Sequence, residues 1–202
     1  LSLEYGITNK DGKPTRNESI KILTTALRAK VTSIDTASAY GDSEKIIGEF
    51  MTSGFSGRSD IITKIFFTNE ELKQTSLKEL VSIKVYQTLI KLKTNQIDTL
   101  LLHRVDYLNV QENVIWETLL TLKSEGLISK LGVSVQNNEE AILALDVDAV
   151  EHIQMPFNIL DWRWNDVIKK IEAVKEIKKL TVHCRSVFLQ GLLLASDSLL
   201  WK

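Results

Sequence analysis

The chain has 202 residues, of which 44% are apolar, and a formal net charge of −1, which indicates one globular domain over residues 1–202 and excludes a disordered chain. No basic run interleaved with aromatics is present and no stretch approaches the roughly 20 apolar residues of a membrane span, so we expect neither a nucleic-acid nor a membrane partner. Cys184 has no cysteine partner and no secretory leader is recognisable, so a cytoplasmic location is expected, with Cys184 as a small buried residue.

Strand-like runs rich in Ile, Val, Leu and Thr alternate with helical patterns along nearly the whole chain. This alternation is typical of a parallel α/β fold, in which each strand is followed by a helix that packs on the sheet. The predicted strands are residues 32–37, 61–66, 97–103, 130–135, 150–157 and 180–187.

Helices are predicted between these strands from apolar spacing and from N-cap residues. Asn17 is the predicted N-cap of a helix over 18–29 and Ser43 that of a helix over 44–50, while Ser76 and Glu79 form a predicted capping box for 77–94. Gly126 is a predicted helix end. Two later helices are predicted over 139–145 and 166–179, the second with Ile168, Ile171, Val174 and Ile177 facing inward.

Two folds share such an alternation, an open doubly wound sheet and a closed barrel. None of the nine glycines has the G-x-G-x-x-G spacing that a dinucleotide-binding open sheet places after its first strand. Polar residues instead follow three successive predicted strands, as in a barrel whose reactive groups lie at the carboxyl ends of its strands. The sequence therefore predicts a (β/α)8 TIM barrel.

Four residues of distinct chemistry would meet at that end of the barrel. Asp35 and Tyr40 follow the first predicted strand, Lys64 lies near the end of the second and His103 ends the third. A phenol has an ordinary pKa of about 10, and a neighbouring ammonium makes its proton easier to give away. Asp35 would keep Lys64 protonated, and His103 would orient a substrate oxygen. Each residue alone has a structural explanation, but together they predict a carbonyl-reducing site with Tyr40 as the proton donor.

The segment 35–44, with the sequence DTASAYGDSE, resembles a signature of the aldo-keto reductase superfamily, and the resemblance extends over nearly the whole chain. It implies that the four residues just named are the family's catalytic tetrad in an NADP-dependent enzyme that uses NADPH, with NAD open as the alternative. The implied substrate is a small molecule that carries an aldehyde or ketone. The six predicted strands would then be strands two to seven, with the first before Leu1 and the last after Lys202.

The same resemblance implies a set of cofactor-binding residues. Ser134 and Gln154 would bind the carboxamide, and the segment after the sixth predicted strand would lie along the dinucleotide. Val135 stands where the family usually has Asn, and Arg185 stands where many members stack a Tyr on the nicotinamide. The residues implied in that segment are Arg185, Ser186, Phe188, Leu189 and Gly191.

Other residues carry weaker predictions. Trp162 is a candidate wall of the substrate pocket, and His152 and His183 are expected to be structural. No pair of His, Cys or acidic residues shows metal-ligand spacing, so no metal is expected. An alternative to the enzyme is a barrel that keeps the cofactor pocket as a redox-sensing or partner-binding module with negligible turnover.

Overall fold

The computed structural model describes residues 12–55, 57 and 59–194. Its strands form one parallel sheet in the order β1-β2-β3-β4-β5-β6, so each strand pairs with the next one along the chain. The six predicted strands are confirmed, and each leaves the ladder one or two residues earlier than predicted because the next residues begin a loop. The strands are β1 (Ser33–Asp35), β2 (Asp60–Ile65), β3 (Ile97–Leu102), β4 (Ile128–Ser134), β5 (His152–Pro156) and β6 (Thr181–Arg185).

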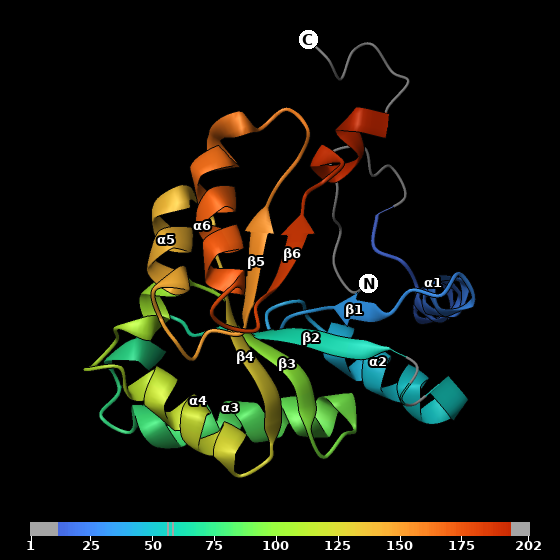
Figure 1. Cartoon of the computed structure of the whole chain (residues 1–202). Coiled ribbons are helices and arrows are strands. Elements are labelled where there is room, and N and C mark those ends of the chain that lie inside the picture. The colour runs from blue at the N-terminus through green and yellow to red at the C-terminus, as the bar shows by residue number, and fades with distance from the viewer. Residues whose placement is uncertain (1–11, 56, 58, 195–202) are drawn as a thin grey trace.

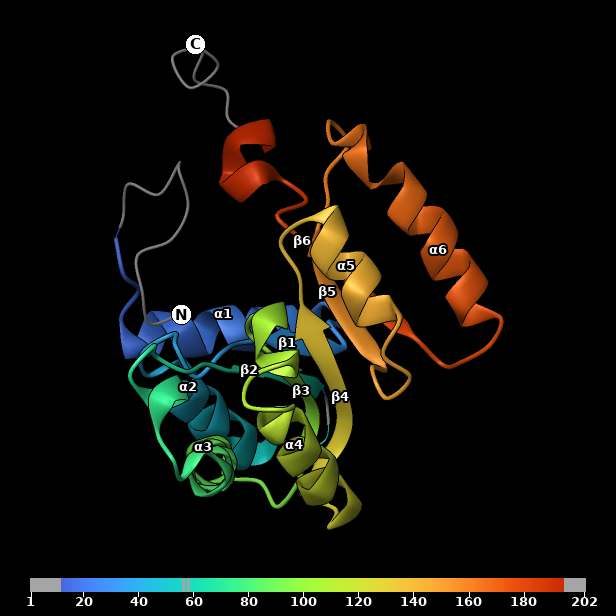
Figure 2. The ribbon, with the colours of Figure 1, turned by 90° about the vertical axis from the view of Figure 1, so that its left-hand side faces the viewer.

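The sheet curls, and the helices lie on its convex outer side (Figures 1 and 2). A helix follows each of the strands β1 to β5. This order is expected for parallel strands, because each connection must carry the chain back to the end of the sheet at which the next strand begins. This arrangement corresponds to part of a barrel. The helices are α1 (Arg16–Arg28), α2 (Ser43–Phe50), α3 (Leu77–Leu92), α4 (Val114–Ser124), α5 (Asn138–Leu145) and α6 (Asn165–Lys175).

Side chains alternate between the two faces of the sheet. Leu102, Val133 and Ile153 point outward and belong to the buried core between sheet and helices. Their neighbours in sequence point to the concave face, and the register pairs Ser134 on β4 with Gln154 on β5. Because parallel strands share one direction, polar residues at their carboxyl ends meet on this concave face, which is where the candidate site lies.

The starts of three helices differ from the predictions. The N-cap of α2 is Asp42 rather than Ser43, which is the first residue of the helix itself. The N-cap of α1 is Thr15 rather than Asn17, and Thr15 and Glu18 form a reciprocal capping box in which the Glu18 carboxylate accepts from the Thr15 N–H at 2.7 Å. At α3 the predicted capping box is wrong, because Ser76 is the N-cap residue but its side chain makes no cap hydrogen bond. Helix α3 nevertheless buries an apolar face that includes Val81 and Val85.

Two burial predictions are also wrong. Ile177 is 86% exposed, because α6 ends at Lys175 and the chain has left the helix before this residue. Cys184 is exposed as well. It lies on β6, which pairs only with β5 in the part of the chain that the structure describes, so this strand is less covered than its neighbours.

Candidate active site

A buried lysine lies on the concave face of β2. The Lys64 side chain is 2% exposed, and its Nζ donates to both carboxylate oxygens of Asp35 at 2.7 and 2.8 Å and to the carbonyl oxygen of Thr36 at 2.8 Å. These acceptors compensate the loss of hydration that makes an unpaired buried ammonium costly. Burial lowers the pKa of Lys64, Asp35 opposes this shift, and the charge of Arg185 adds to it. The structure thus brings Asp35 and Lys64 into direct contact.

The loop after β1 carries Tyr40 to the same place. Ser38 ties this loop to β2, since its N–H donates to the Lys64 carbonyl at 2.9 Å and its hydroxyl accepts from the Phe66 N–H at 3.2 Å. Gly41, at φ 56°, turns the chain directly after the tyrosine, in a conformation that glycine adopts without steric cost. Tyr40 is 36% exposed, and its ring centroid lies 5.4 Å from Lys64 Nζ. The phenol is therefore both accessible and close to the buried cation.

His103 follows β3 and completes the cluster. Its ring lies edge-on to Tyr40, with centroids 6.0 Å apart, and edge-on to Phe66 at 5.7 Å. Burial lowers the pKa of His103 to about 4, and the charges of Lys64 and Arg185 contribute to this shift. The imidazole is therefore neutral at pH 7, with one N–H donor and one lone pair. Its buried Nδ1 has no hydrogen-bond partner among the residues that the structure describes.

Gln154 on β5 connects a distant strand of the sheet to this cluster. Its Nε2 donates to Asp35 Oδ1 at 2.8 Å, so the contact reaches across the concave face from β5 to β1. Because a carboxylate only accepts, the amide nitrogen must face Asp35 and the amide oxygen points elsewhere. That Oε1 is buried and accepts no hydrogen bond within the described part of the chain. Ser134, its register partner on β4, is 2% exposed.

Arg185 at the end of β6 is held by the loop after β4. Its Nη2 donates to the Val135 carbonyl at 3.1 Å and to Gln136 Oε1 at 2.5 Å. The Val135 side chain belongs to the outer core, so the residue offers only its backbone to the concave face. Gln136 was not predicted from the sequence, although its position directly after the predicted strand 130–135 could have indicated it.

The other predicted cofactor-binding residues follow the carboxyl end of β6 in a tightly wound segment. Ser186, Leu189 and Gln190 have φ values of 59°, 47° and 56°, and Gly191 has 94°. Three residues other than glycine in the left-handed region make this a strained backbone. Phe188 is 55% exposed. The structure places the segment directly after Arg185, at the carboxyl end of β6.

The two tryptophans in the loop after β5 differ in their exposure to solvent. Trp164 is 2% exposed, and its indole N–H donates to Asp161 at 3.2 Å, whereas Trp162 is 78% exposed. A cavity of about 170 Å³ near this loop is walled by Trp164 and not by Trp162. The pocket role of Trp162 therefore stays a prediction. The residues that line the cavity are Gln136, Asn137, Asn138, Glu139, Arg163 and Trp164.

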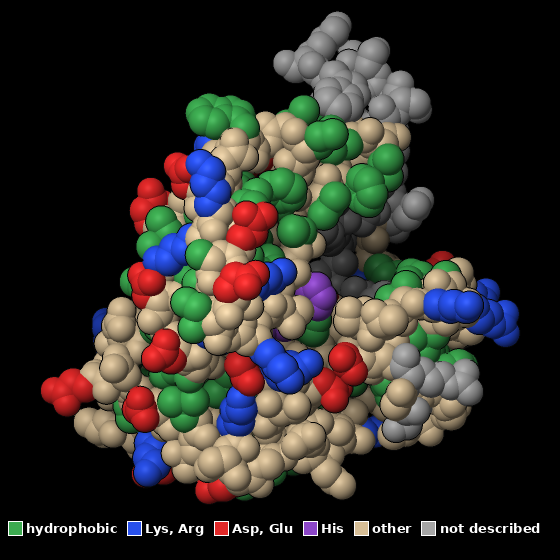
Figure 3. Space-filling view, in the orientation of Figure 1, with side chains coloured by type: hydrophobic (Ala, Val, Ile, Leu, Met, Phe, Trp, Pro, Cys, Tyr) green, Lys and Arg blue, Asp and Glu red, His purple; other side chains and the backbone are tan. Residues whose placement is uncertain are grey.

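Hydrophobic side chains gather over the loops that follow β5 and β6, whereas charged side chains of both signs are spread over the left and lower parts of the same face (Figure 3). The exposed members of this group follow the strands whose ends carry Gln154 and Arg185. They give the carboxyl-end side of the sheet an apolar rim. The exposed residues are Ile159, Leu160, Trp162, Val187, Phe188 and Leu194.

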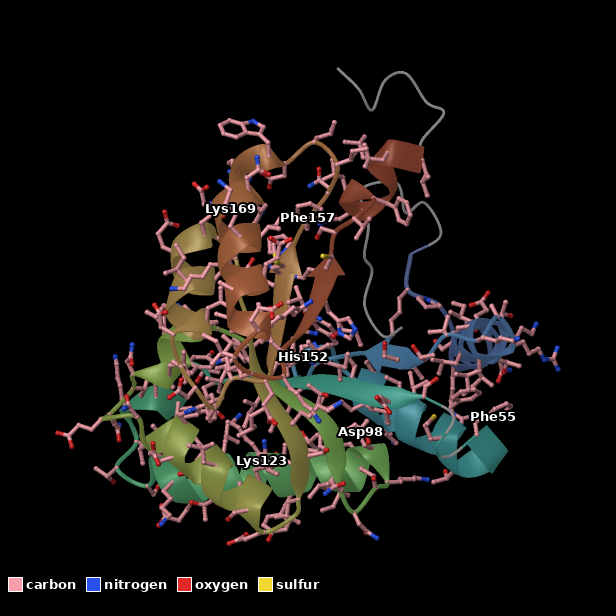
Figure 4. All side chains as sticks on the ribbon, in the orientation of Figure 1. Phe55, Asp98, Lys123, His152, Phe157 and Lys169 are labelled. Atoms are coloured by element: carbon pink, nitrogen blue, oxygen red, sulfur yellow. The ribbon has the colours of Figure 1, made fainter. Side chains whose placement is uncertain are left out.

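His152 lies at the start of β5, near the middle of the molecule (Figure 4). It is 2% exposed, its ring centroid lies 4.6 Å from that of His183, and its Nε2 has no hydrogen-bond partner in the described ranges. Burial, followed by the neighbouring groups His183, Lys130 and Lys64, lowers the pKa of His152 from 6.5 to about 4. The folded protein therefore keeps this imidazole neutral in mild acid.

Because the folded protein keeps His152 neutral, we expect its free energy of unfolding to decrease as the pH falls. In the unfolded chain the imidazole has its ordinary pKa near 6.5, so between that value and about 4 the unfolded state binds more protons than the folded state. The free energy of unfolding must then decrease as the pH decreases through this window. His103 contributes in the same direction.

Urea unfolding at about pH 7.5 and about pH 5 measures the effect. We expect the parent to lose more stability between the two than His152→Gln, whose side chain takes up no proton and which keeps His103 unchanged. Equal losses in the two proteins would show that His152 does not cause the acid sensitivity.

No helix within residues 12–55 and 59–194 is long and apolar enough to cross a bilayer. No group of three or more His, Cys, Asp or Glu side chains in those same ranges is arranged to hold a metal ion.

The chain is similar to known proteins and solved structures. An aryl-alcohol dehydrogenase (NADP+) of Phanerodontia chrysosporium is 29% identical over 196 residues, covering 89% of this chain and 48% of that protein. Aldo-keto reductase YhdN of Bacillus subtilis is 30% identical over 149 residues, covering 71% and 44%. The crystal structure of an aldo-keto reductase from Klebsiella pneumoniae in complex with NADPH has a TM-score of 0.69 at 21% identity, covering 90% and 61%.

The chain spans about half the length of the curated relatives that it matches. The likeness to the solved structure concerns the fold, which is the same curled α/β sheet over most of the chain. Residues 4–198 match the model of the Aldo/keto reductase family. With a match over nearly its full length, the chain belongs to the aldo/keto reductase family.

Proposed function

We propose that the protein is an oxidoreductase that reduces the carbonyl group of a small aldehyde or ketone to an alcohol with a nicotinamide dinucleotide. The observation that carries this proposal is the cluster on the concave face. There the Tyr40 ring lies 5.4 Å from the ammonium of Lys64, which is paired with Asp35, and 6.0 Å from the ring of His103. Membership of the family supports it. We further propose that the six strands belong to an eight-stranded barrel.

Each residue of the cluster has a role in the proposed reaction. When bound, the reduced nicotinamide supplies the hydride that reaches the carbonyl carbon. Tyr40 donates the proton that the carbonyl oxygen needs, and the Lys64 ammonium beside it makes the phenol a better proton donor. Asp35 holds Lys64 in place. The neutral His103 donates a hydrogen bond that orients the substrate oxygen and stabilises the negative charge developing on it.

The concave face also offers groups that suit a carboxamide. The buried Oε1 of Gln154 is an acceptor without a partner in the described residues, and Ser134 lies beside it in the ladder. A carboxamide carries N–H donors and a carbonyl acceptor, so an unused buried acceptor is the kind of group it would satisfy. We propose NADPH as the preferred donor, because two relatives are described with NADP+ or NADPH. NADH is the alternative. Arg185, Ser186, Phe188, Leu189 and Gly191 would complete the dinucleotide site.

The apolar rim supports an aromatic or otherwise apolar substrate. The exposed side chains after β5 and β6 would lose contact with water when such a molecule binds, which favours binding in proportion to the apolar area covered. We propose that Trp162 contributes to this surface. The aryl-alcohol dehydrogenase among the relatives is named for a substrate of the same kind.

One observation favours a second function, a cofactor-binding module with negligible turnover. Val135 and Arg185, both on the cofactor side, are the two positions that differ from the family pattern. The Val135 side chain lies in the outer core, and the Arg185 side chain is bound by the loop after β4. The full tetrad favours the enzyme over this alternative.

Turnover distinguishes the two functions. The purified protein is mixed with NADPH or NADH and an aromatic aldehyde such as benzaldehyde, and the loss of reduced-nicotinamide absorbance is followed. We expect steady reduction with NADPH and slower reduction with NADH. Tight NADPH binding without reduction of any aldehyde would contradict the proposed reductase function and support the cofactor-binding module.

A further inference from the structure

Glu44 is a buried acidic residue that the proposed reaction does not use. It lies in the first turn of α2 and is 1% exposed. Its Oε1 accepts from the Thr63 hydroxyl at 2.7 Å and from the Thr88 hydroxyl at 3.4 Å, and the Lys91 Nζ lies 3.7 Å from its Oε2. Burying an acid is costly unless such partners compensate it, so this arrangement ties three elements to one carboxyl group.

The packing of α2 holds this carboxyl group in one position. Gly48 lies one helical turn after Glu44 and therefore on the same face of α2. A Cβ at Gly48 would lie 2.2 Å from the Lys91 carbonyl oxygen, so the glycine allows α2 to approach the backbone of α3 closely. Glu44 consequently lies within hydrogen-bond reach of both Thr63 on β2 and Thr88 on α3.

The contacts of Glu44 lead directly to the candidate site. Thr63 precedes Lys64 in β2, and because side chains alternate along a strand, Thr63 faces α2 while Lys64 faces the concave side. The hydrogen bond from Thr63 thus attaches the N-terminus of α2 to the back of the strand that carries the buried lysine.

A second attachment lies next to the first. The Thr36 hydroxyl donates to the Ser43 hydroxyl at 2.8 Å, and the carbonyl of Thr36 accepts from Lys64 Nζ at 2.8 Å. The loop that carries Tyr40 runs between Thr36 and Ser43, so both of its ends are tied to β2. Glu44 provides the attachment at the end closer to α2.

We propose that Glu44 is a positioning residue, which holds the N-terminus of α2 on β2 and so fixes the Tyr40 phenol relative to Lys64 and His103. This inference rests on the proposed reductase function. A displacement of a reacting group by about 1 Å can lower a rate by about 10²-fold, so a carboxyl group that touches no substrate can still control turnover.

The test compares kcat, KM and NADPH affinity in folded variants, with folding checked by circular dichroism and urea unfolding. Glu44→Ala should lower kcat by about 10-fold or more and change KM and the NADPH Kd by less than about 2-fold. Glu44→Gln keeps an acceptor oxygen for Thr63 and should restore kcat to within about 3-fold of the parent. If Glu44→Ala does not fold, Thr63→Val removes the same hydrogen bond from the other side and should reproduce the loss.

Thr118→Val is the matched control. The Thr118 hydroxyl is buried in α4 and donates only to the Val114 carbonyl of its own helix, so its loss should affect stability and leave kcat unchanged. A double variant shows where Glu44 acts: in a Tyr40→Phe background, Glu44→Ala should cause no further loss of the residual rate.

Different results overturn different statements. A parent protein without turnover contradicts the proposed function and this inference with it. If the parent turns over, the inference alone is wrong when folded Glu44→Ala keeps the parental kcat, when Glu44→Gln fails to restore it, or when Glu44→Ala lowers the rate equally with and without the Tyr40 hydroxyl.

Discussion

Replacing Tyr40 with phenylalanine should lower kcat for aldehyde reduction by about 10² to 10⁴-fold, the contribution that a positioned general acid typically makes. The substitution deletes only the hydroxyl, so the ring keeps its edge-on contact with His103 and its place near Lys64. NADPH affinity, measured by the quenching of tryptophan fluorescence, should change little because the phenol is proposed to act on the substrate oxygen.

Tyr86→Phe is the matched control for that experiment. Tyr86 is 50% exposed on the outer face of α3, far from the concave side in the fold, and loss of its hydroxyl should leave kcat unchanged. If purified Tyr40→Phe reduces aldehydes as fast as the parent, Tyr40 is not the proton donor and the proposed mechanism is wrong.

The convergence of the tetrad could be predicted because it depends on local signals. Lys64 lies within β2, Asp35 and His103 lie at or directly after the carboxyl ends of β1 and β3, and Tyr40 lies in the loop after β1. The parallel topology brings all of them to the same end of the sheet. The contact between Gln154 and Asp35 had no such signal. It joins residues of β5 and β1 that are far apart in the sequence, and it depends on the curl of the sheet.

Helix starts show where sequence patterns run out. Thr15-x-x-Glu18 and Ser76-x-x-Glu79 have the same spacing, yet only the first forms a capping box. Thr15 has the extended backbone that an N-cap needs, with φ −64° and ψ 163°, whereas Ser76 has φ −98° and ψ 37°. The residue types within the motif do not reveal this difference in backbone geometry.

Glu44 illustrates a similar limit at the site. Its position in the first turn of α2 favours an interaction with the helix N-terminus, and that explanation is sufficient from the sequence alone. The structure shows contacts to Thr63 and Thr88 instead, which belong to two other elements. Only the packing of α2 on α3, allowed by Gly48, brings these partners within reach.

Replacing Lys64 with methionine should lower kcat by about 10²-fold or more, because the phenol of Tyr40 loses the ammonium that makes it a better proton donor. Methionine fills a similar volume without charge, and Asp35 keeps the hydrogen bond from Gln154, so steady-state kinetics can be compared in folded protein. Lys84→Met, which removes a lysine paired with Glu71, is the control and should retain the parental kcat.

The decisive measurement is a double-mutant cycle on kcat between Lys64 and Tyr40. If Lys64 acts through the phenol, its substitution has nothing left to impair once the hydroxyl is gone, so the double variant should be no slower than Tyr40→Phe. If the two losses instead multiply, Lys64 acts on another group, for example by holding Asp35 and, through it, the amide of Gln154. That result would move the role of the ion pair from proton donation to the cofactor side of the site.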